Sequence, residues 1–492
     1  MDYSQFLVMH QEIGLLVLIL LIFLFDTFSS RQVPRGISMF SVCLFGLLTV
    51  AGFVFPWDKA VASAFGGMYV TSPVMIAIKN VLNVGVFIVL LQSMSWTDSE
   101  FMRIRRGEFY ELLLITLFGM YLMISARHFL LFIIGLETAS LPLAALVAFD
   151  KNRYESHEAA VKYILTAVFS SAVFMMGLSF VYGLAGTLYF NDIAGACFGG
   201  NVMLIVAIAF VIAGFGFKLS LVPFHLWTAD VYQGAPTAVT SYLSVISKGA
   251  AAFAFFVVMV QVFGPFYSGI WEWMLYALII LTITIGNLFA LRQKNLKRFL
   301  AFSSISQAGY IMLGVIAGSA QGLGSLIFYI LVYIFSNLAA FGVISAIENK
   351  TGRVDMDSYN NLYSTNPKLA FTMMLAMFSL AGIPPFAGFF SKFFIFSAAV
   401  QPGTPALYIL TLIALINTII SLYYYLLVVK AMFIKNQEEC VIPTFRSAGS
   451  ERLGMWICVA GIILVGLVSC IYNTLISAAK MNTEYIFTFF AN

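Results

Sequence analysis

Long apolar runs divide this sequence, and they constrain the fold more than any other feature. Hydrophobic residues make up 61% of the 492 residues and charged residues only 10%, whereas soluble domains carry about 25% charged residues. A helix that crosses a bilayer needs about 20 mostly apolar residues, and about fourteen such runs can be marked along the chain. The sequence therefore predicts an all-α, multi-pass protein surrounded by lipid.

The predicted spans begin near residues 12, 36, 74, 108, 129, 157, 202, 236, 273, 300, 322, 368, 404 and 453. The first run, from Glu12 to Phe28, is longer than the apolar region of a signal peptide, and no small-residue cleavage site follows it. We therefore expect the first run to be retained as a membrane span.

The distribution of positive charge predicts an orientation. If the N-terminus lies outside, 18 of the 26 lysines and arginines fall in loops on the inner side, and only Lys59, Arg127 and Lys480 fall outside. Short cytoplasmic loops carry an excess of Lys and Arg. We therefore expect an inner (cell) membrane protein with both termini on the periplasmic side. The positive charge is dispersed, which argues against nucleic-acid binding.

Five lysines and no arginine lie inside the predicted spans. Ionisable residues inside a membrane are costly and usually functional. A lysine can release its proton in an apolar environment, whereas arginine stays charged at any biological pH. This choice of residue type is suited to proton handling. The five are Lys79, Lys162, Lys218, Lys248 and Lys392.

Lys248 is the strongest candidate because it lies near the middle of the eighth predicted span, where the side chain is farthest from water. Lys162 opens the sixth span nearer the cytoplasm. Glu137 is an acid near the centre of the fifth span, and Lys162 and Lys218 are its candidate partners. The alternative for Glu137 is a structural ion pair. Lys79, like Asp26 at the end of the first span, is interpreted mainly as an interfacial anchor.

Two spans carry helix-breaking residues close to a lysine. Lys218 lies about one turn before Pro223, and Lys392 follows the Gly-Ile-Pro-Pro segment at 382–385 by about two turns. Broken helices with a charge at the break are typical of ion-handling transporters. Lys218 could instead extend toward the cytoplasmic side. His225, after Pro223, could relay protons or cap a loop.

The positions of the two breaks predict an internal repeat. If spans four to eight correspond to spans nine to thirteen, the seventh span matches the twelfth, and five helices per unit make the second unit inverted. We therefore divide the chain into 1–107 (spans one to three), 108–265 (first repeat), 266–435 (second, inverted repeat) and 436–492 (span fourteen and tail).

Several stretches resemble a known family. "FKLSLVPFHLWTADVYQGAPTAVTSYLSVISK", "EAAVKYILTAVFSSAVFMMGLSFVYGLAGT", "LKRFLAFSSISQAGYIMLG" and "SLAGIPPFAGFFSKFF" resemble, in the same order, the subunit N family of proton-pumping NADH:quinone oxidoreductase, respiratory complex I. The shorter motifs are shared with sister subunits L and M and with Mrp-type antiporters. Ala229 stands where the family often has proline, and Gln307 where it often has histidine.

The resemblance implies roles for five residues. Glu137 and Lys218 resemble the coupled acid–lysine pair of the first half, and Lys162 resembles a nearby modulating lysine. Lys248 resembles the central proton carrier, and Lys392 the terminal carrier of the second half-channel. The resemblance also implies neighbouring subunits K and M, with L, J, A and H in the same complex. NADH, FMN, iron–sulfur clusters and quinone would be bound by partner subunits.

No redox, cofactor or metal site is expected in this chain. The five cysteines are scattered and never form a C-x-x-C pair, and the four histidines do not cluster. The expected function is therefore proton translocation driven by redox chemistry in partner subunits. Three alternatives remain: a subunit of an Mrp-type cation/proton antiporter, a solute carrier, and an inert membrane scaffold. The isolated buried lysines argue against the last two.

Overall fold

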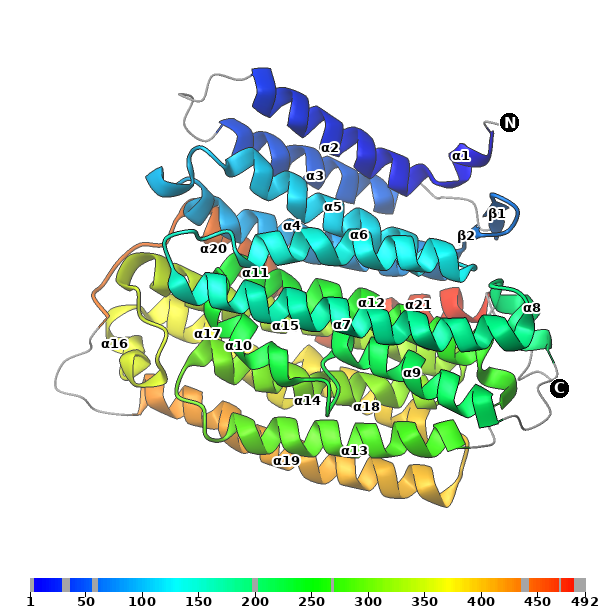
Figure 1. The fold of residues 1–492 in the computed structure, drawn as a ribbon. Helices are drawn as coiled ribbons and strands as arrows, with labels where there is room; N and C mark the ends of the chain where they lie inside the picture. Colours follow the sequence, from blue (N-terminus) through cyan, green and yellow to red (C-terminus); the bar gives the residue numbers. More distant parts are fainter. Residues whose placement is uncertain are drawn as a thin grey trace.

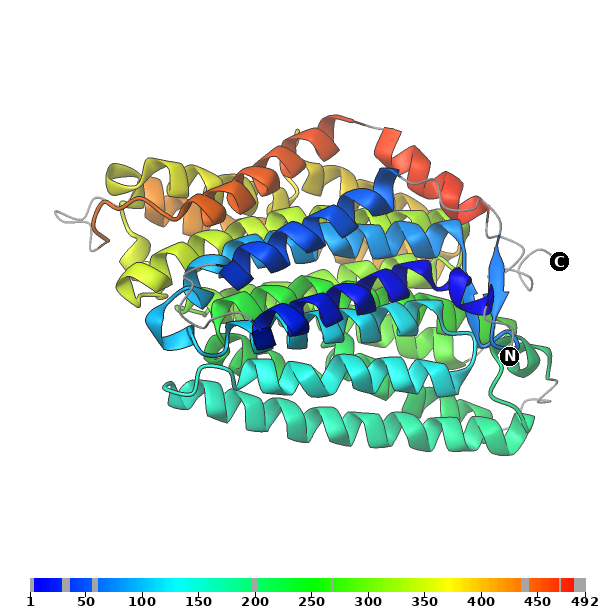
Figure 2. The ribbon, with the colours of Figure 1, turned by 90° about the horizontal axis from the view of Figure 1, so that it is seen from above.

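Long helices that run roughly alongside one another build almost the whole molecule (Figures 1 and 2). The computed structural model describes residues 4–28, 36–54, 61–196, 202–266, 270–434, 442–468 and 470–481. Its α-helices are α1 (Ser4–Val8), α2 (His10–Phe28), α3 (Gly36–Val54), α4 (Pro73–Thr97), α5 (Arg106–Ser125), α6 (Phe129–Val147), α7 (Tyr154–Ala185), α8 (Phe190–Gly195), α9 (Val202–Leu219), α10 (Leu226–Gly234), α11 (Thr237–Tyr242), α12 (Lys248–Val257), α13 (Ile270–Ala290), α14 (Leu296–Ile316), α15 (Ala320–Thr351), α16 (Leu362–Thr365), α17 (Pro367–Ala381), α18 (Ala387–Val400), α19 (Pro405–Phe433), α20 (Gly449–Leu467) and α21 (Cys470–Lys480). Short 3-10 turns are η1 (Glu100–Met102), η4 (Gly264–Phe266) and η5 (Met356–Tyr359).

The predicted multi-pass, all-helical fold is confirmed. Within the described residues, thirteen helices are long and apolar enough to cross a membrane, and each begins within four residues of a predicted span. The predicted twelfth span is instead divided between two shorter apolar helices, α17 and α18. The eighth span, Thr237–Val262, joins α11 and α12 through two π-helical stretches, η2 (Leu243–Ser247) and η3 (Val258–Val262).

The two predicted helix breaks are both present. The first separates α9 from α10, and the second separates α17 from α18. A break frees backbone groups that must find partners inside a membrane. At the first break the Phe217 carbonyl accepts from Ser220 N and from the Trp227 indole, at 3.0 and 3.1 Å. At the second, Gly382 closes α17 with φ of +86°, a conformation that glycine adopts without strain.

Corresponding elements of the two predicted repeats share several features. Helices α7 and α15 are both 32 residues long and both end at a left-handed glycine, Gly186 or Gly352. Each of these helices is followed by a broken helix, and each proposed unit opens with an adjacent pair, α5 with α6 or α13 with α14. These likenesses are in line with the proposed repeat, whose boundaries and inversion stay predictions.

One small element was not expected from the sequence. Strands β1 (Ala62–Ala64) and β2 (Tyr69–Thr71) form an antiparallel hairpin before α4. The turn between them contains Gly66 and Gly67, both with positive φ. Three-residue strands are too short for an alternating pattern to be recognised, and the Gly-Gly pair was the only local signal for a hairpin.

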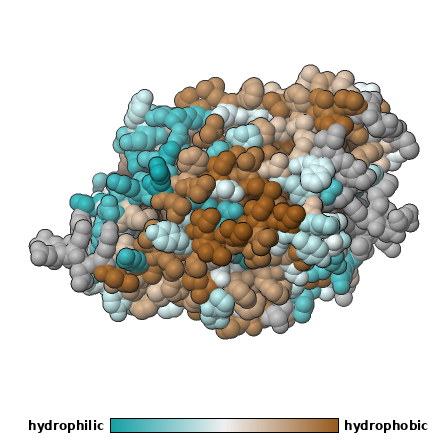
Figure 3. All heavy atoms as spheres, turned by 90° about the horizontal axis from the view of Figure 1, so that it is seen from below, coloured by the Kyte–Doolittle hydropathy of each residue, from teal (hydrophilic) through white to brown (hydrophobic). Residues whose placement is uncertain are grey.

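The outer face has the polarity of a membrane protein. Seen from below, a broad hydrophobic area crosses the middle of the molecule, and hydrophilic residues gather toward one end (Figure 3). On α19, the large apolar side chains of Ile409, Leu412, Ile416 and Ile419 are all exposed. Their spacing of three and four residues places them along one face of the helix, which is suited to contact with lipid.

Candidate functional site

Four of the five intramembrane lysines are buried inside the bundle. Lys79, Lys218, Lys248 and Lys392 have at most 9% of their surface exposed. The fifth, Lys162, has a side chain that is 42% exposed. Three of the buried lysines, at positions 218, 248 and 392, form no ion pair with a described carboxylate.

Lys248 sits where the helical winding of the eighth span changes. The π-helical turn η2 ends at Ser247, and α12 begins at Lys248 itself. π-helical turns are rare and often occur at functional sites. The Lys248 ammonium donates to the Ser304 hydroxyl of α14 at 2.8 Å and lies 5.5 Å from the centre of the Tyr232 ring. A hydroxyl and an aromatic face are therefore its main polar surroundings.

Lys218, on α9 just before the first break, donates to the Ser140 hydroxyl of α6. Its ammonium also lies 5.9 Å from the centre of the Tyr163 ring on α7, close enough for a cation–π attraction. Glu137 lies three residues before Ser140, on the same side of α6. The Glu137 Oε1 atom is buried and has no hydrogen-bond partner among the described residues.

Lys392, on α18, uses backbone groups that the second break sets free. Its ammonium donates to the carbonyls of Leu380 and Ala381, each at 2.9 Å. These carbonyls lie at the end of α17, where an intact helix would bond them to later amides. The ammonium also lies 5.4 Å from the centre of the Tyr310 ring. The break and the lysine thus form one site.

Each of these three lysines lines a small cavity of its own. Each cavity has about 10 Å³ of room for the centre of a water molecule, which suffices for about one water. Lys218 and Ser247 line the first cavity. Lys248 lines the second together with Tyr333, and Tyr333 also lines the third with Lys392. Neighbouring lysines are therefore linked by shared or adjacent lining residues.

The third cavity also contains neutral polar groups. Gln307 receives a hydrogen bond from the Tyr329 hydroxyl and donates to the Tyr425 hydroxyl at 3.1 Å. An amide does not titrate near neutral pH, so Gln307 can orient hydroxyls or water without holding a proton. The Tyr333 hydroxyl has no hydrogen-bond partner among the described residues and can accept or donate.

Lys162 does not pair with Glu137, which was one of its predicted partners. Its ammonium instead contacts Glu158 on its own helix and Asp230 on α10, each at 2.7 Å. Among the described residues, no ion pair within 4.0 Å joins Glu137 to Lys218 either. Lys218 instead donates to the Ser140 hydroxyl, which donates in turn to the Leu136 carbonyl of its own helix.

His225 occupies the N-cap position of α10, but its side chain makes no capping hydrogen bond. The residue is buried, and its Nδ1 atom has no hydrogen-bond partner among the described residues. His225 therefore does not cap α10 with its side chain, and the loop-capping role stays a prediction. A relay role remains a prediction, because the free ring nitrogen is available to a water or a hydroxyl.

The interpretation of Lys79 as an interfacial anchor is wrong. Lys79 is fully buried and pairs with Glu12 of α2 at 2.6 Å. The Tyr69 hydroxyl of β2 donates to the other Glu12 oxygen at 2.8 Å. Three elements, α2, β2 and α4, therefore meet at one buried ion pair. Sequence reasoning missed Glu12 because its partner lies 67 residues away.

Replacing Lys79 by methionine is expected to destabilise the chain. The change leaves the Glu12 carboxylate buried without its cation, which typically costs about 3–5 kcal/mol. Adding Glu12→Gln to the same chain should recover much of the loss, because the uncompensated charge disappears. The measurement is the amount of assembled complex and its melting temperature in detergent. A double variant that is less stable than Lys79→Met would contradict the pairing.

Sequence reasoning also missed the hydroxyls that contact the lysines or line their cavities. Ser140, Ser304 and Tyr333 lie on spans far from their lysines in the sequence, and serine or tyrosine in an apolar helix gives no specific signal. Lys297 was assigned to an inner loop, but it lies in the first turn of α14 and is fully buried. Its burial follows from contacts with α15 and with the segment before α11.

Comparisons with known proteins agree with the family and the fold expected from the sequence. Residues 126–421 match the family described as "NADH:quinone oxidoreductase/Mrp antiporter, TM". A protein of Azobacteroides pseudotrichonymphae named NADH-quinone oxidoreductase subunit N is 54% identical over 96% of this chain and 98% of its own. A protein of Phocaeicola vulgatus with the same name is 53% identical over 97% of this chain and 100% of its own.

Solved structures share the fold. A chain of respiratory complex I from Thermus thermophilus with bound aureothin matches with a TM-score of 0.78 and 32% identity, over 93% of this chain and 97% of that one. A chain of the Mrp complex from Dietzia sp. matches with a TM-score of 0.83 over 99% of this chain and 98% of that one, but at 20% identity it shows the fold alone. With relatives of 53–54% identity over nearly its whole length, the chain belongs to the NADH:quinone oxidoreductase/Mrp antiporter membrane family, among the proteins named NADH-quinone oxidoreductase subunit N.

Proposed function

We propose that this chain translocates protons as a membrane subunit of NADH:quinone oxidoreductase, with Lys218, Lys248 and Lys392 as the proton carriers. One observation carries the proposal: these three lysines are buried without a described carboxylate partner, and each lines a small cavity whose lining is shared with or adjacent to that of the next. Keeping a buried ammonium without a counter-charge costs free energy. This cost favours release of its proton when another positive charge approaches.

The neighbouring groups are suited to relaying a proton between the carriers. The hydroxyls of Ser140, Ser304 and Tyr333 can each accept a hydrogen bond while donating another. Ser304 already accepts from Lys248. Each cavity has room for about one water, and we propose that these waters and hydroxyls pass the proton from one lysine to the next. Glu137, three residues before Ser140 on α6, is proposed to act as the acid next to Lys218, the first of the three carriers. Lys162 is proposed to act on α10 through its contact with Asp230.

The membrane context of the proposal rests on the charge pattern. The loops that join α4 to α5, α6 to α7 and α13 to α14 lie at the end of the molecule opposite α1 and α21 (Figure 1). These loops were predicted to be basic and cytoplasmic. We infer an inner-membrane subunit with both termini on the periplasmic side. Subunits K and M are the proposed neighbours, and NADH, FMN, iron–sulfur clusters and quinone are proposed to be bound elsewhere in the complex.

A double-mutant cycle on Glu137 and Lys218 tests the first step of the proposed route. Glu137→Gln and Lys218→Met should each lower proton flux per NADH oxidised, and the double variant should lose much less than the sum, with a coupling of about 1 kcal/mol or more. The physical reason is that each single change leaves one charge without the other.

The measurement is acidification of sealed inverted vesicles beside NADH oxidation rate and complex content. Lys368→Met is the matched control, because Lys368 is an exposed lysine on α17 and should behave like the parent. Additive losses from Glu137→Gln and Lys218→Met would show that the two residues act independently. Parental flux in both single variants would contradict the proposed function in this half of the chain.

A further inference from the structure

The Asp230 carboxylate is shared between cations from two parts of the chain. Its Oδ2 atom contacts the Lys162 ammonium of α7 at 2.7 Å, and its Oδ1 atom contacts the Arg298 guanidinium of α14 at 2.6 Å. Arg298 also donates to the Gln233 side chain one turn later on α10, at 3.2 Å. Helix α10 is thus held between one helix of the first half and one helix of the second half.

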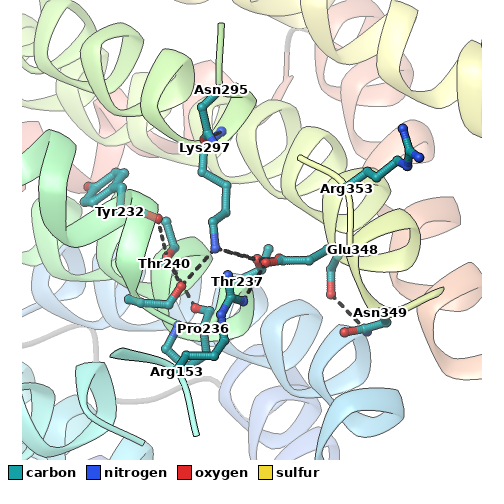
Figure 4. A network of polar contacts seen from close by, with 12 residues as sticks. Arg153, Tyr232, Pro236, Thr237, Thr240, Asn295, Lys297, Glu348, Asn349 and Arg353 are labelled. Atoms are coloured by element: carbon teal, nitrogen blue, oxygen red, sulfur yellow. Dashed lines mark hydrogen bonds and ion pairs between the residues drawn. The ribbon is translucent and has the colours of Figure 1, made fainter. Parts of the chain in front are cut away.

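The neighbouring residue of α14 holds the other end of the same segment. Lys297 donates to the Ala235 carbonyl at 3.0 Å and contacts Glu348 of α15 at 3.3 Å (Figure 4). Glu348 also accepts from Thr237, at the start of α11, and from Arg153 at 2.9 Å. The first turn of α14 therefore holds both α10 and the beginning of the eighth span, which leads to Lys248.

The first turn of α14 is also well placed to act on the carriers. The Asn295 side chain caps it by accepting from the amides of Lys297 and Arg298, and a window of α14 long enough to span the membrane is completely buried. Ser304, the hydroxyl that contacts Lys248, lies six residues after Arg298, which is about 9 Å along the same helix. A shift of the first turn is therefore transmitted to Ser304.

We propose that Asp230 is a positioning residue that couples Lys162 in the first half to α14 in the second half, and through α14 to the contact between Ser304 and Lys248. This inference rests on the proposed function, because it assigns Lys248 a part in proton transfer. Lys162 and Arg298 share the Asp230 carboxylate. A change in the charge or position of Lys162 therefore alters the ion pair between Asp230 and Arg298 of α14. Asp230 itself does not need to hold a translocated proton.

From the exposure of these groups we expect the contact to contribute little to folding. The side chains of Lys162, Asp230 and Arg298 are between 32% and 42% exposed, and ion pairs of this kind typically contribute about 0–1 kcal/mol. Variants at Asp230 and Arg298 should therefore assemble normally. A loss of proton flux in an assembled variant then reports on positioning rather than on folding.

The chain offers a matched control for Asp230. Glu158 contacts the same Lys162 ammonium at the same distance of 2.7 Å, but it lies on α7 itself, four residues before the lysine. Glu158→Gln removes one carboxylate from Lys162 without removing the connection to α14. Asp230→Asn removes both the carboxylate and the connection, and Arg298→Gln removes only the connection.

The test uses the intact complex with these variants in sealed inverted vesicles and in detergent. Asp230→Asn and Arg298→Gln should each lower proton flux per NADH oxidised as much as Lys162→Met does, and their combination should be no worse than either alone. Glu158→Gln should keep the parental flux, and Arg298→Lys should recover part of it. Amide hydrogen exchange across residues 226–240 should rise about two- to fivefold in the first two variants only.

Parental flux in assembled Asp230→Asn and Arg298→Gln would overturn the inference, and so would unchanged exchange in both. An equal loss of flux in Glu158→Gln would also overturn it, because Lys162 would then need only a nearby carboxylate. If Asp230→Asn does not assemble, the comparison of Arg298→Gln with Arg298→Lys decides. Failure of the proposed function is distinguished by Lys248→Met, which would then pump as well as the parent whatever the exchange data show.

Discussion

Replacing Lys248 by methionine is expected to abolish or strongly reduce proton flux through this subunit while the complex still assembles. Methionine has a similar length but cannot carry a proton, so the hydrogen bond to Ser304 and the central carrier disappear together. Assembly should be retained, because removing a lysine from the centre of a span removes an insertion cost of about 2.5–3.5 kcal/mol.

The measurement for Lys248→Met is NADH-driven acidification of sealed vesicles, with subunit content determined by immunoblot. Ser304→Ala is an informative companion, because it removes the hydroxyl that accepts from Lys248 at 2.8 Å and leaves the lysine in place. Its loss of flux should be smaller than that of Lys248→Met. Normal pumping by an assembled Lys248→Met complex would exclude the carrier role of this residue.

The second large effect is expected for Lys392→Arg, which should assemble and yet pump poorly. Guanidinium groups can donate to the Leu380 and Ala381 carbonyls as the ammonium does, so the positive charge at the break is kept. Arginine does not release its proton at biological pH. A carrier must release its proton to pass it on, so charge alone should not support proton flux.

Lys392→Met is the companion variant in this second experiment. It removes both the positive charge and the transferable proton, whereas Lys392→Arg keeps the charge. If Lys392 is a carrier, the methionine and arginine variants should show similarly low flux per NADH oxidised. The arginine variant should retain more complex than the methionine variant, because only arginine can satisfy the two carbonyls. If Lys392→Arg pumps as well as the parent, the residue acts as a fixed charge at the helix break.

The fold was predictable from the sequence because its main signals are local. A span of about 20 apolar residues and a Gly-Ile-Pro-Pro interruption can each be recognised within a short window. All the long helices began where the apolar runs began, and both breaks lay at the predicted prolines. The Lys392 site followed from the same local reasoning, since the lysine binds carbonyls freed only twelve and eleven residues earlier.

The site was less predictable wherever a partner lies on another helix. The pair of Glu12 and Lys79 joins residues 67 positions apart, and Lys162 reaches Asp230 over 68 positions. Charge alone suggested Glu137 as a partner for Lys162, but helix packing brought Glu158 and Asp230 to the lysine instead. Long-range pairs of this kind are set by helix packing, which leaves no local signal in one sequence.

The small size of the three lysine-lined cavities has a consequence for ion selectivity. A metal cation in a protein needs several oxygen ligands around it, and of the three cavities only the third is lined by several side-chain hydroxyl and amide oxygens. An ammonium group in each cavity also repels any second cation. A proton needs only a continuous row of hydrogen bonds. We therefore expect the dimensions and charge of the cavities to disfavour sodium and potassium relative to protons in this conformation.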